Sequence, residues 1–138
     1  MNKIINKNFH FILISIIIVV IGYWYFSSVN GLKNVSNRQK YTTALVVSDW
    51  HHKNTSGIGI DYEYFVNNIK YTNTINLDLK KGQKYLLVFD SIEPVNNVIL
   101  DIYPIYNTSP IPLNGWKINE LPIKVDSTKI NNIILEKY

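Results

Sequence analysis

Apolar residues form one long unbroken run and several short alternating runs along this chain. The unbroken run, Phe9 to Phe26, contains no charged residue. As a helix, at about 1.5 Å per residue, it would span about 27 Å, which nearly matches the hydrocarbon core of a bilayer. A backbone in lipid must satisfy its hydrogen bonds internally. The run therefore predicts a single transmembrane helix over residues 9–26, preceded by an N-terminal tail, residues 1–8.

A cleaved signal peptide is the alternative, because Lys3 and Lys7 before an apolar run also fit such a segment. Cleavage needs small residues at a set spacing, and after the run the chain offers only Val29 and Gly31. The aromatic residues that end the run are typical of a membrane interface. A retained anchor is therefore the preferred interpretation.

Beyond a polar juxtamembrane linker or frayed helical extension, residues 27–40, apolar positions recur with a period of two. Residues 58–66 alternate most cleanly and predict a strand. Asn67-Asn68 can adopt positive φ, so residues 69–75 are expected to return in a tight antiparallel hairpin. The resulting register pairs apolar with apolar residues: Val66 with Ile69, Tyr64 with Tyr71 and Ile60 with Ile75.

Further strands are expected at residues 41–50, 84–90 and 98–103, with the HHKNTSG segment after the first of them as a loop. The strand at 84–90 is apolar on both faces and should be doubly buried. Five strands of this size predict an all-β fold, either a small antiparallel barrel or a curved sheet, since closure removes exposed edges. This β domain is expected to cover residues 41–103.

All five prolines lie in the C-terminal half of the chain. Residues 104–138 are therefore expected to be a proline-containing extension packed on the β domain, with Trp116 as a packing anchor. Near its end, Asp126 or Ser127 could cap a short helix. The apolar stripe of that helix would be Ile130, Ile133 and Ile134.

Charge is divided unevenly between these segments. The chain has 14 Lys and Arg against 10 Asp and Glu, but residues 1–40 hold five basic and no acidic side chains. The remaining residues carry nine lysines against all ten acidic residues, so 9 minus 10 gives a charge of −1. Because Arg38 is the only arginine and the domain has no basic surplus, the composition argues against a nucleic-acid partner.

Asp49, His51 and His52 are the nearest approach to a metal or acid–base cluster. Only Asp49 and His51 share a face of extended chain, so a third ligand would have to come from Asp61 or Glu63 across the hairpin. Asp61 and Glu63 also share a strand face, as a carboxylate pair for glycoside cleavage would. A solvated loop and a water-facing strand account for the same residues. The absence of cysteine excludes thiolate metal sites and thiol nucleophiles. No catalytic, cofactor-binding or metal-ligating residue is assigned.

Aromatic residues are abundant, with ten tyrosines and three tryptophans. They could form a platform for a sugar or a peptide, but most tyrosines fall on predicted inner faces, where a small domain needs large side chains. Core packing is therefore the preferred interpretation. The residues on which it depends are Tyr62, Tyr64, Tyr71 and Tyr85.

The chain resembles small membrane-anchored bacterial β domains of unknown function in the order of its segments: a span, TTALVVS, DYEYFVNNIKYT, KKGQKYLLVFD and SIEPVNNVIL. In these domains a v-Y-x-y-x-v-n-g-k-x-Y hairpin precedes a G-x-x-y-x-v-x-y-d-x-x-x-P strand and turn. The similarity covers about Tyr41 to Ile102 and rests on patterned apolar residues with Gly82 and Pro94. The chain departs from the pattern at Asn67-Asn68, where a glycine is common. The resemblance implies a compact β fold and brings no catalytic residue.

The sequence thus indicates a single-pass membrane protein, not an enzyme, that presents a β domain as a binding or assembly module near the bilayer. The alternatives are a membrane-tethered hydrolase or metal enzyme built on Asp49, His51, Asp61 and Glu63, and an envelope sensor for a carbohydrate or peptide. Expected partners are the lipid bilayer, through residues 9–26, and another protein or a second copy of the chain, with no cofactor. A bacterial inner membrane with the domain outside is the expected location, because the short N-terminal tail fits a signal anchor.

Overall fold

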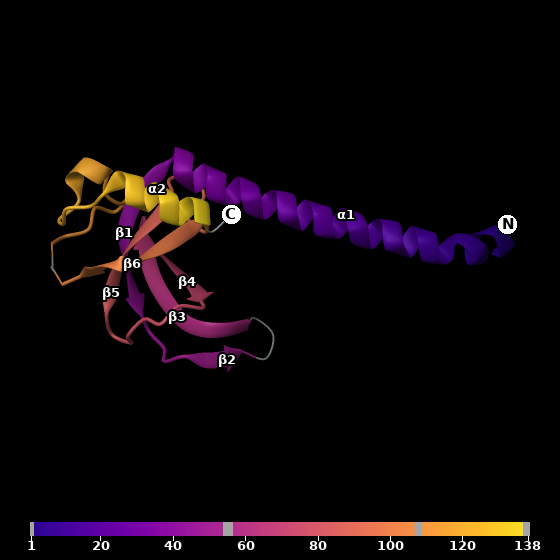
Figure 1. Cartoon of the computed structure of the whole chain (residues 1–138), viewed down its shortest axis with the longest axis horizontal. Coiled ribbons are helices and arrows are strands. Elements are labelled where there is room, and N and C mark those ends of the chain that lie inside the picture. Colours follow the sequence, from indigo (N-terminus) through magenta and orange to yellow (C-terminus); the bar gives the residue numbers. More distant parts are fainter. Residues whose placement is uncertain (1, 54–56, 107–108, 137–138) are drawn as a thin grey trace. The chain divides into compact units, whose positions relative to one another are not determined.

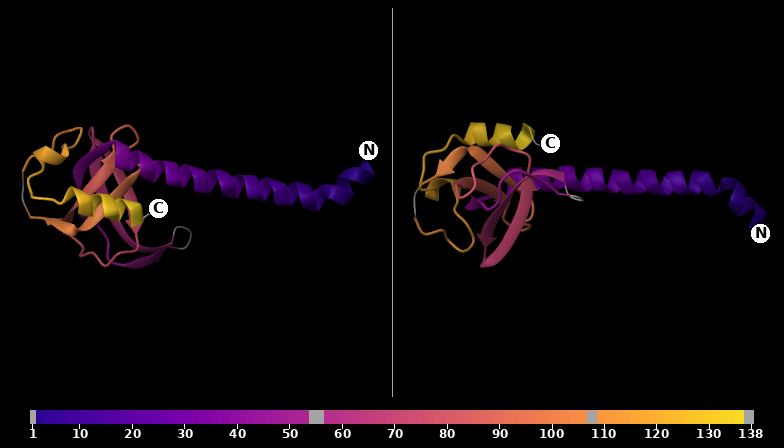
Figure 2. Two further views of the ribbon diagram at one scale, coloured as in Figure 1. Left: turned by 45° about the horizontal axis from the view of Figure 1, so that its top comes forward. Right: turned by 90° about the horizontal axis from the view of Figure 1, so that it is seen from below.

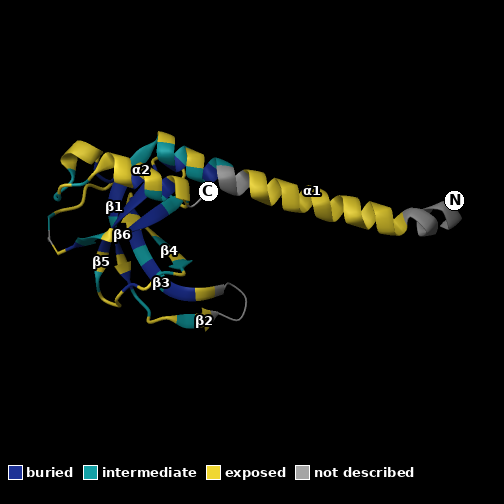
Figure 3. Ribbon diagram, viewed as in Figure 1, coloured by how far each residue is buried: buried dark blue, intermediate teal, exposed yellow. Residues whose placement is uncertain are grey.

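The computed structural model describes residues 2–53, 57–106 and 109–136, and it divides into two units, Met1–Gly31 and Leu32–Tyr138. Helix α1 begins at Asn2 and ends at Asn37 (Figure 1). Every side chain from Phe9 to Phe26 is exposed, as the yellow part of α1 in Figure 3 shows. This helix is long and apolar enough to cross a membrane. The residues after the span therefore form a helical extension rather than an irregular linker.

The second unit is built on six antiparallel strands that form one open, curved sheet. The strand order is β4-β3-β1-β5-β6, and β2 also pairs with β3. Within the described residues β4 pairs only with β3, and β6 only with β5, so the curved-sheet prediction is confirmed and the barrel does not close. The strands are β1 Gln39–Val46, β2 His51–Lys53, β3 Gly57–Val66, β4 Ile69–Ile75, β5 Lys84–Asp90 and β6 Asn97–Ile105.

The β3–β4 hairpin has the predicted register. Its central residues, Asn67 and Asn68, have φ of 52° and 63°, as a two-residue turn of this type requires. Asparagine tolerates this conformation because its short polar side chain can hydrogen-bond locally. The pairs Val66–Ile69, Tyr64–Tyr71 and Ile60–Ile75 are all present.

The predicted strand at residues 41–50 and the loop after it are wrong in detail. β1 ends at Val46, because the Ser48 hydroxyl, 2.8 Å from the Asp61 nitrogen, accepts the hydrogen bond that a backbone carbonyl would accept in a regular ladder. Pairing with β3 then resumes, and His51–Lys53 forms β2 instead of a loop. The chain thus bulges away from β3 at a polar residue that replaces the backbone as partner. Residues 54–56 lie outside the described part of the chain.

Two apolar clusters lie on opposite faces of the sheet, so β5 is buried on both sides as predicted. Tyr85, Leu87 and Phe89 face one cluster, together with the inner residues of β1, β3 and β4. Leu86 and Val88 face the other cluster, which packs against α2 and the last turns of α1. Figure 2 shows α2 lying across this second face. The domain therefore has a core of its own.

The C-terminal segment covers the second cluster. β6 continues through Pro104 to Ile105, two residues farther than predicted, and a short 3-10 helix, η1, follows at Ile118–Glu120. Trp116 is buried, and its backbone exchanges two hydrogen bonds with that of Tyr41. Helix α2, Ser127–Glu136, is capped by Asp126, whose Oδ1 accepts from the nitrogens of Thr128 and Lys129. Its buried stripe consists of Ile130 and Ile134, with Ile133 half-buried.

Gly59 allows the end of β4 to approach β3 closely. A Cβ atom at this position would lie 2.2 Å from the carbonyl oxygen of Ile75. We expect Gly59→Ala to lower the free energy of unfolding by about 1–3 kcal/mol, the usual cost of overpacking. Urea unfolding followed by circular dichroism measures it. Gly82→Ala is the control for backbone strain, because a Cβ there meets nothing within 4 Å, and a smaller loss for Gly59→Ala than for this control would contradict the steric explanation.

Candidate functional site

The structure brings together two of the four predicted site residues. His51 on β2 and Asp61 on β3 lie side by side, with 3.5 Å between His51 Nε2 and Asp61 Oδ2. Asp49 instead pairs with Lys81, 3.1 Å from Nζ to Oδ2, and Glu63 pairs with a lysine of β4 at 2.6 Å. In the described part of the chain no group of three or more His, Asp and Glu residues is arranged to hold a metal ion.

The hydrogen bonds around His51 indicate that its pair with Asp61 has a structural role. Its Nδ1 lies 2.9 Å from the backbone oxygen of Asp49, which can only accept, so Nδ1 carries a proton. The Ser48 hydroxyl is 3.3 Å from the same nitrogen and therefore has no base there to activate it. Asp61 Oδ1 also accepts from the Thr74 hydroxyl at 2.6 Å. These bonds hold the bulge between β1 and β2 in place and form no nucleophile–base pair.

The tryptophans divide between core and surface. Trp116 is only 5% exposed and belongs to the second cluster, so it cannot contact a ligand. Trp50, in the bulge, is 53% exposed and packs edge-on against His52, with 5.1 Å between ring centroids. Of the aromatic residues considered for a ligand platform, Trp50 is thus available at the surface.

A stack of tyrosines runs across β3 and β4 on the inner face of the sheet. The ring centroids of Tyr62 and Tyr64 are 6.2 Å apart, and those of Tyr64 and Tyr71 are 5.2 Å apart. The Tyr62 and Tyr64 hydroxyls donate to Asn97 Oδ1 and the Pro94 carbonyl, each at 2.7 Å. Burial raises the pKa of both hydroxyls. Tyr71 lies half-buried at the end of the stack, on the outermost strand.

One edge of the open sheet, β6, is protected against further pairing. The pairing of β6 with β5 is irregular: Tyr85 pairs with Pro104, but the next residue of β5, Leu86, pairs with Leu100. Pro104 has no N–H to donate, and irregular strands with proline are a common means of blocking an edge. Helix α2 packs against the same strand.

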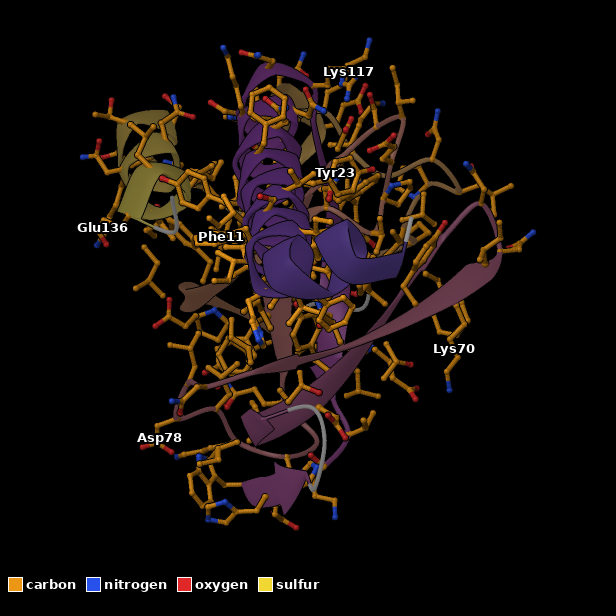
Figure 4. All side chains as sticks on the ribbon, turned by 90° about the vertical axis from the view of Figure 1, so that its right-hand side faces the viewer. Phe11, Tyr23, Lys70, Asp78, Lys117 and Glu136 are labelled. Carbon is orange, nitrogen blue, oxygen red and sulfur yellow. The ribbon has the colours of Figure 1, made fainter. Side chains whose placement is uncertain are left out.

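The other edge, β4, has none of these protections. Its seven residues, IKYTNTI, contain neither proline nor glycine, and their register with β3 is unbroken. The lysine of this strand, Lys70, lies along the outside of the hairpin in Figure 4, and its Nζ is held 2.6 Å from Glu63 Oε1. A regular, extended edge of this kind is a template for another strand. Sequence reasoning missed this feature, although the unbroken β-forming segment after the Asn-Asn turn is its signal.

No protein-family model, curated protein or solved structure matches this chain. The resemblance to small membrane-anchored bacterial β domains therefore stays a prediction. The function has to be argued from the residues described above.

Proposed function

We propose that this is a single-pass membrane protein that holds its β domain close to the bilayer as a binding or assembly module. One observation carries the proposal: the side chains from Phe9 to Phe26 are all exposed, whereas the domain buries its own two clusters without them. An apolar surface that extends round a whole helix is unfavourable in water and is normally covered by protein or lipid. Because the domain does not cover this helix surface, we infer that lipid covers it.

The domain's polar groups favour binding over catalysis. Two of the four candidate carboxylate and imidazole residues, Asp49 and Glu63, are drawn into ion pairs with lysines. A third, His51, directs its Nδ1 to a backbone oxygen. The edge of β4 remains as a regular surface that can engage a partner through backbone hydrogen bonds.

We infer an orientation with the N-terminus in the cytoplasm and the domain outside, across a bacterial inner membrane. Lys3 and Lys7 lie just before the apolar segment. On the other flank Arg38 is paired with Asp90, so its charge is offset within the folded domain. The basic residues nearest the span, Lys3 and Lys7, are on the N-terminal flank, whereas Lys33, Arg38 and Lys40 lie farther from it on the other side, which supports this direction. A periplasm-dependent reporter fused after Tyr138 should be active, and activity of a cytoplasm-dependent reporter alone would reverse the assignment.

Membrane fractionation tests the anchor. The full chain expressed in bacteria should remain in the membrane pellet after an alkaline wash and should have the mass of the uncut chain. Ile17→Arg with Ile18→Arg should move most of it out of the pellet, because arginine at the centre of a span is strongly unfavourable.

Matched controls are Ile92→Arg and Val95→Arg, at exposed positions of the turn between β5 and β6. These variants should stay in the membrane pellet. A soluble wild-type protein that has lost its first residues would contradict the proposal and indicate a cleaved signal peptide.

A further inference from the structure

We propose that β4 pairs with β4 of a second copy of this chain, antiparallel and about a two-fold axis at Thr72, so that two open sheets join into one. The proposal rests on the proposed function, in that it names the partner of the assembly module. It follows from the direction of the backbone groups, the sequence of the strand and the contrast between the two sheet edges.

The hairpin determines which backbone groups of β4 face outward. In a two-residue hairpin the residues next to the turn, Val66 and Ile69, form a hydrogen-bonded pair, and such pairs alternate along the strands. The N–H and C=O groups of Ile69, Tyr71, Asn73 and Ile75 therefore face β3. Those of Lys70, Thr72 and Thr74 point to the open edge.

The strand has an isoleucine at each end, equally far from Thr72. If Thr72 faces its counterpart, Ile69 lies opposite Ile75, Tyr71 opposite Asn73, and Lys70 opposite Thr74. The two isoleucines then meet each other, no two like charges face each other, and the two copies of Tyr71 become diagonal neighbours that extend the tyrosine stack. Because Lys70, Thr72 and Thr74 are the outward-facing residues, these same positions would form the hydrogen-bonded pairs of the new ladder.

The side chains on and beside the edge are compatible with this partner. Ile69 is 56% exposed although it continues the inner face, so a second strand would cover apolar surface. The charge of Lys70 is held by Glu63 rather than projecting over the edge. Asn73 Oδ1 accepts from the Thr74 nitrogen at 2.8 Å, a bond that the carbonyl of Lys70 from the second copy would replace. Anchoring in one membrane would also raise the effective concentration of copies.

The absence of cysteine permits a cross-linking test in intact membranes. Across the axis the two Thr72 Cα atoms would lie about 5.5 Å apart, within the range of a disulfide. Thr72→Cys should therefore form a disulfide-linked homodimer under mild oxidation. The two copies of Lys70 would lie about 14 Å apart, given about 3.4 Å per residue along a strand, so Lys70→Cys alone should not.

Two controls test the register of the pairing and measure the rate of random cross-linking. Lys70→Cys and Thr74→Cys expressed together in one cell should cross-link to each other. Ile92→Cys, exposed in the turn between β5 and β6, measures random collision. Dimer formation by Thr72→Cys should exceed that of Ile92→Cys by about tenfold or more, because paired thiols have an effective concentration in the millimolar range. Equal rates, or efficient dimer formation by Lys70→Cys alone, would overturn the proposal.

A second pair of variants tests the backbone contact in detergent. Thr72→Pro removes an N–H that faces away from β3, so the hairpin keeps its own ladder while the edge loses its central donor. By light scattering it should be monomeric, with the circular dichroism of the wild type, whereas Thr72→Val should remain dimeric. A Thr72→Pro dimer, or a Thr72→Cys adduct with a different protein, would contradict self-pairing.

Failure of this inference is distinguishable from failure of the proposed function. A monomer that stays in the membrane pellet would refute the pairing through β4 and leave the anchor intact. A chain that leaves the pellet would refute the anchor, whatever its oligomeric state.

Discussion

Replacement of Asp90 by alanine is expected to lower the free energy of unfolding by about 3 kcal/mol, the lower end of the usual cost of breaking a buried ion pair, because the Arg38 side chain left behind is 34% exposed and can be solvated. Asp90 is completely buried at the end of β5, and its Oδ2 lies 2.5 Å from Nη2 of Arg38. Its Oδ1 accepts from the Ile92 nitrogen at 3.0 Å, so alanine would leave both donors without their acceptor. The Arg38 carbonyl also accepts from the Ser91 nitrogen, which makes this corner the connection between α1 and the sheet.

A double-mutant cycle separates the pair from the rest of this corner. Arg38→Ala alone should also destabilise, because it leaves a buried carboxylate without its cation. The double variant should lose less than the sum of the two single losses, and chemical unfolding in detergent measures all four proteins. Asp101→Ala, at an exposed acidic residue of β6, is the control and should change little. Additive losses would show that Arg38 and Asp90 do not interact energetically.

Local patterns are sufficient to predict most of the elements and one register. The alternation at residues 58–66 and the Asn67-Asn68 turn determine the β3–β4 hairpin, because turn and partners are close in the chain. The doubly apolar segment 84–90 likewise predicts a central strand, and Asp126 with its following isoleucines predicts α2. Each of these signals acts over a few residues.

Features that depend on distant residues were not predictable from such patterns. The pairing of Arg38 with Asp90 joins positions 52 apart in the sequence. β1 ends where the Ser48 hydroxyl accepts a hydrogen bond from the backbone of Asp61 on β3. The alternation of apolar and polar residues gives no sign of this contact. The sheet would close only if β4 and β6, which lie at opposite ends of the strand order, paired with each other. The bulge and Pro104 make β6 unsuitable for such pairing. Contacts between residues distant in the sequence therefore determine that the sheet stays open and that β4 forms an unprotected edge.

The same distinction applies to the candidate site. Shared strand faces predict the pairs Asp49 with His51 and Asp61 with Glu63, whereas the structure brings together one residue from each pair, His51 and Asp61. The short hairpin turn predicts that Lys70 can pair with Glu63, as it does, but no local pattern indicates that Lys81 pairs with Asp49. Residue type and alternation locate acidic groups on a face and can indicate a partner across a tight turn, but a partner distant in the sequence, such as Lys81 for Asp49, follows only from the fold.

Alkaline pH is expected to destabilise the domain steeply above about pH 10. Burial raises the pKa of Tyr41 from 10.0 to about 12, and it also raises those of Tyr62 and Tyr64, the last increased further by its tyrosine neighbours. Between the unfolded and folded pKa values the unfolded chain has lost these protons and the folded chain retains them, so stability falls as pH rises. Each such group contributes about 1.4 kcal/mol per pH unit, and three together about 4 kcal/mol.

Unfolding by urea at a series of pH values, from neutrality to about pH 12, measures this slope, and the absorbance of tyrosinate reports when the hydroxyls ionise. Tyr41→Phe should remove about a third of the slope above pH 10, since it removes one of the three groups. Its matched control, Tyr106→Phe, changes a ring that is 81% exposed and should keep the full slope. If the buried tyrosines ionised in the folded protein near pH 10, or if both variants changed the slope equally, burial would not be the cause.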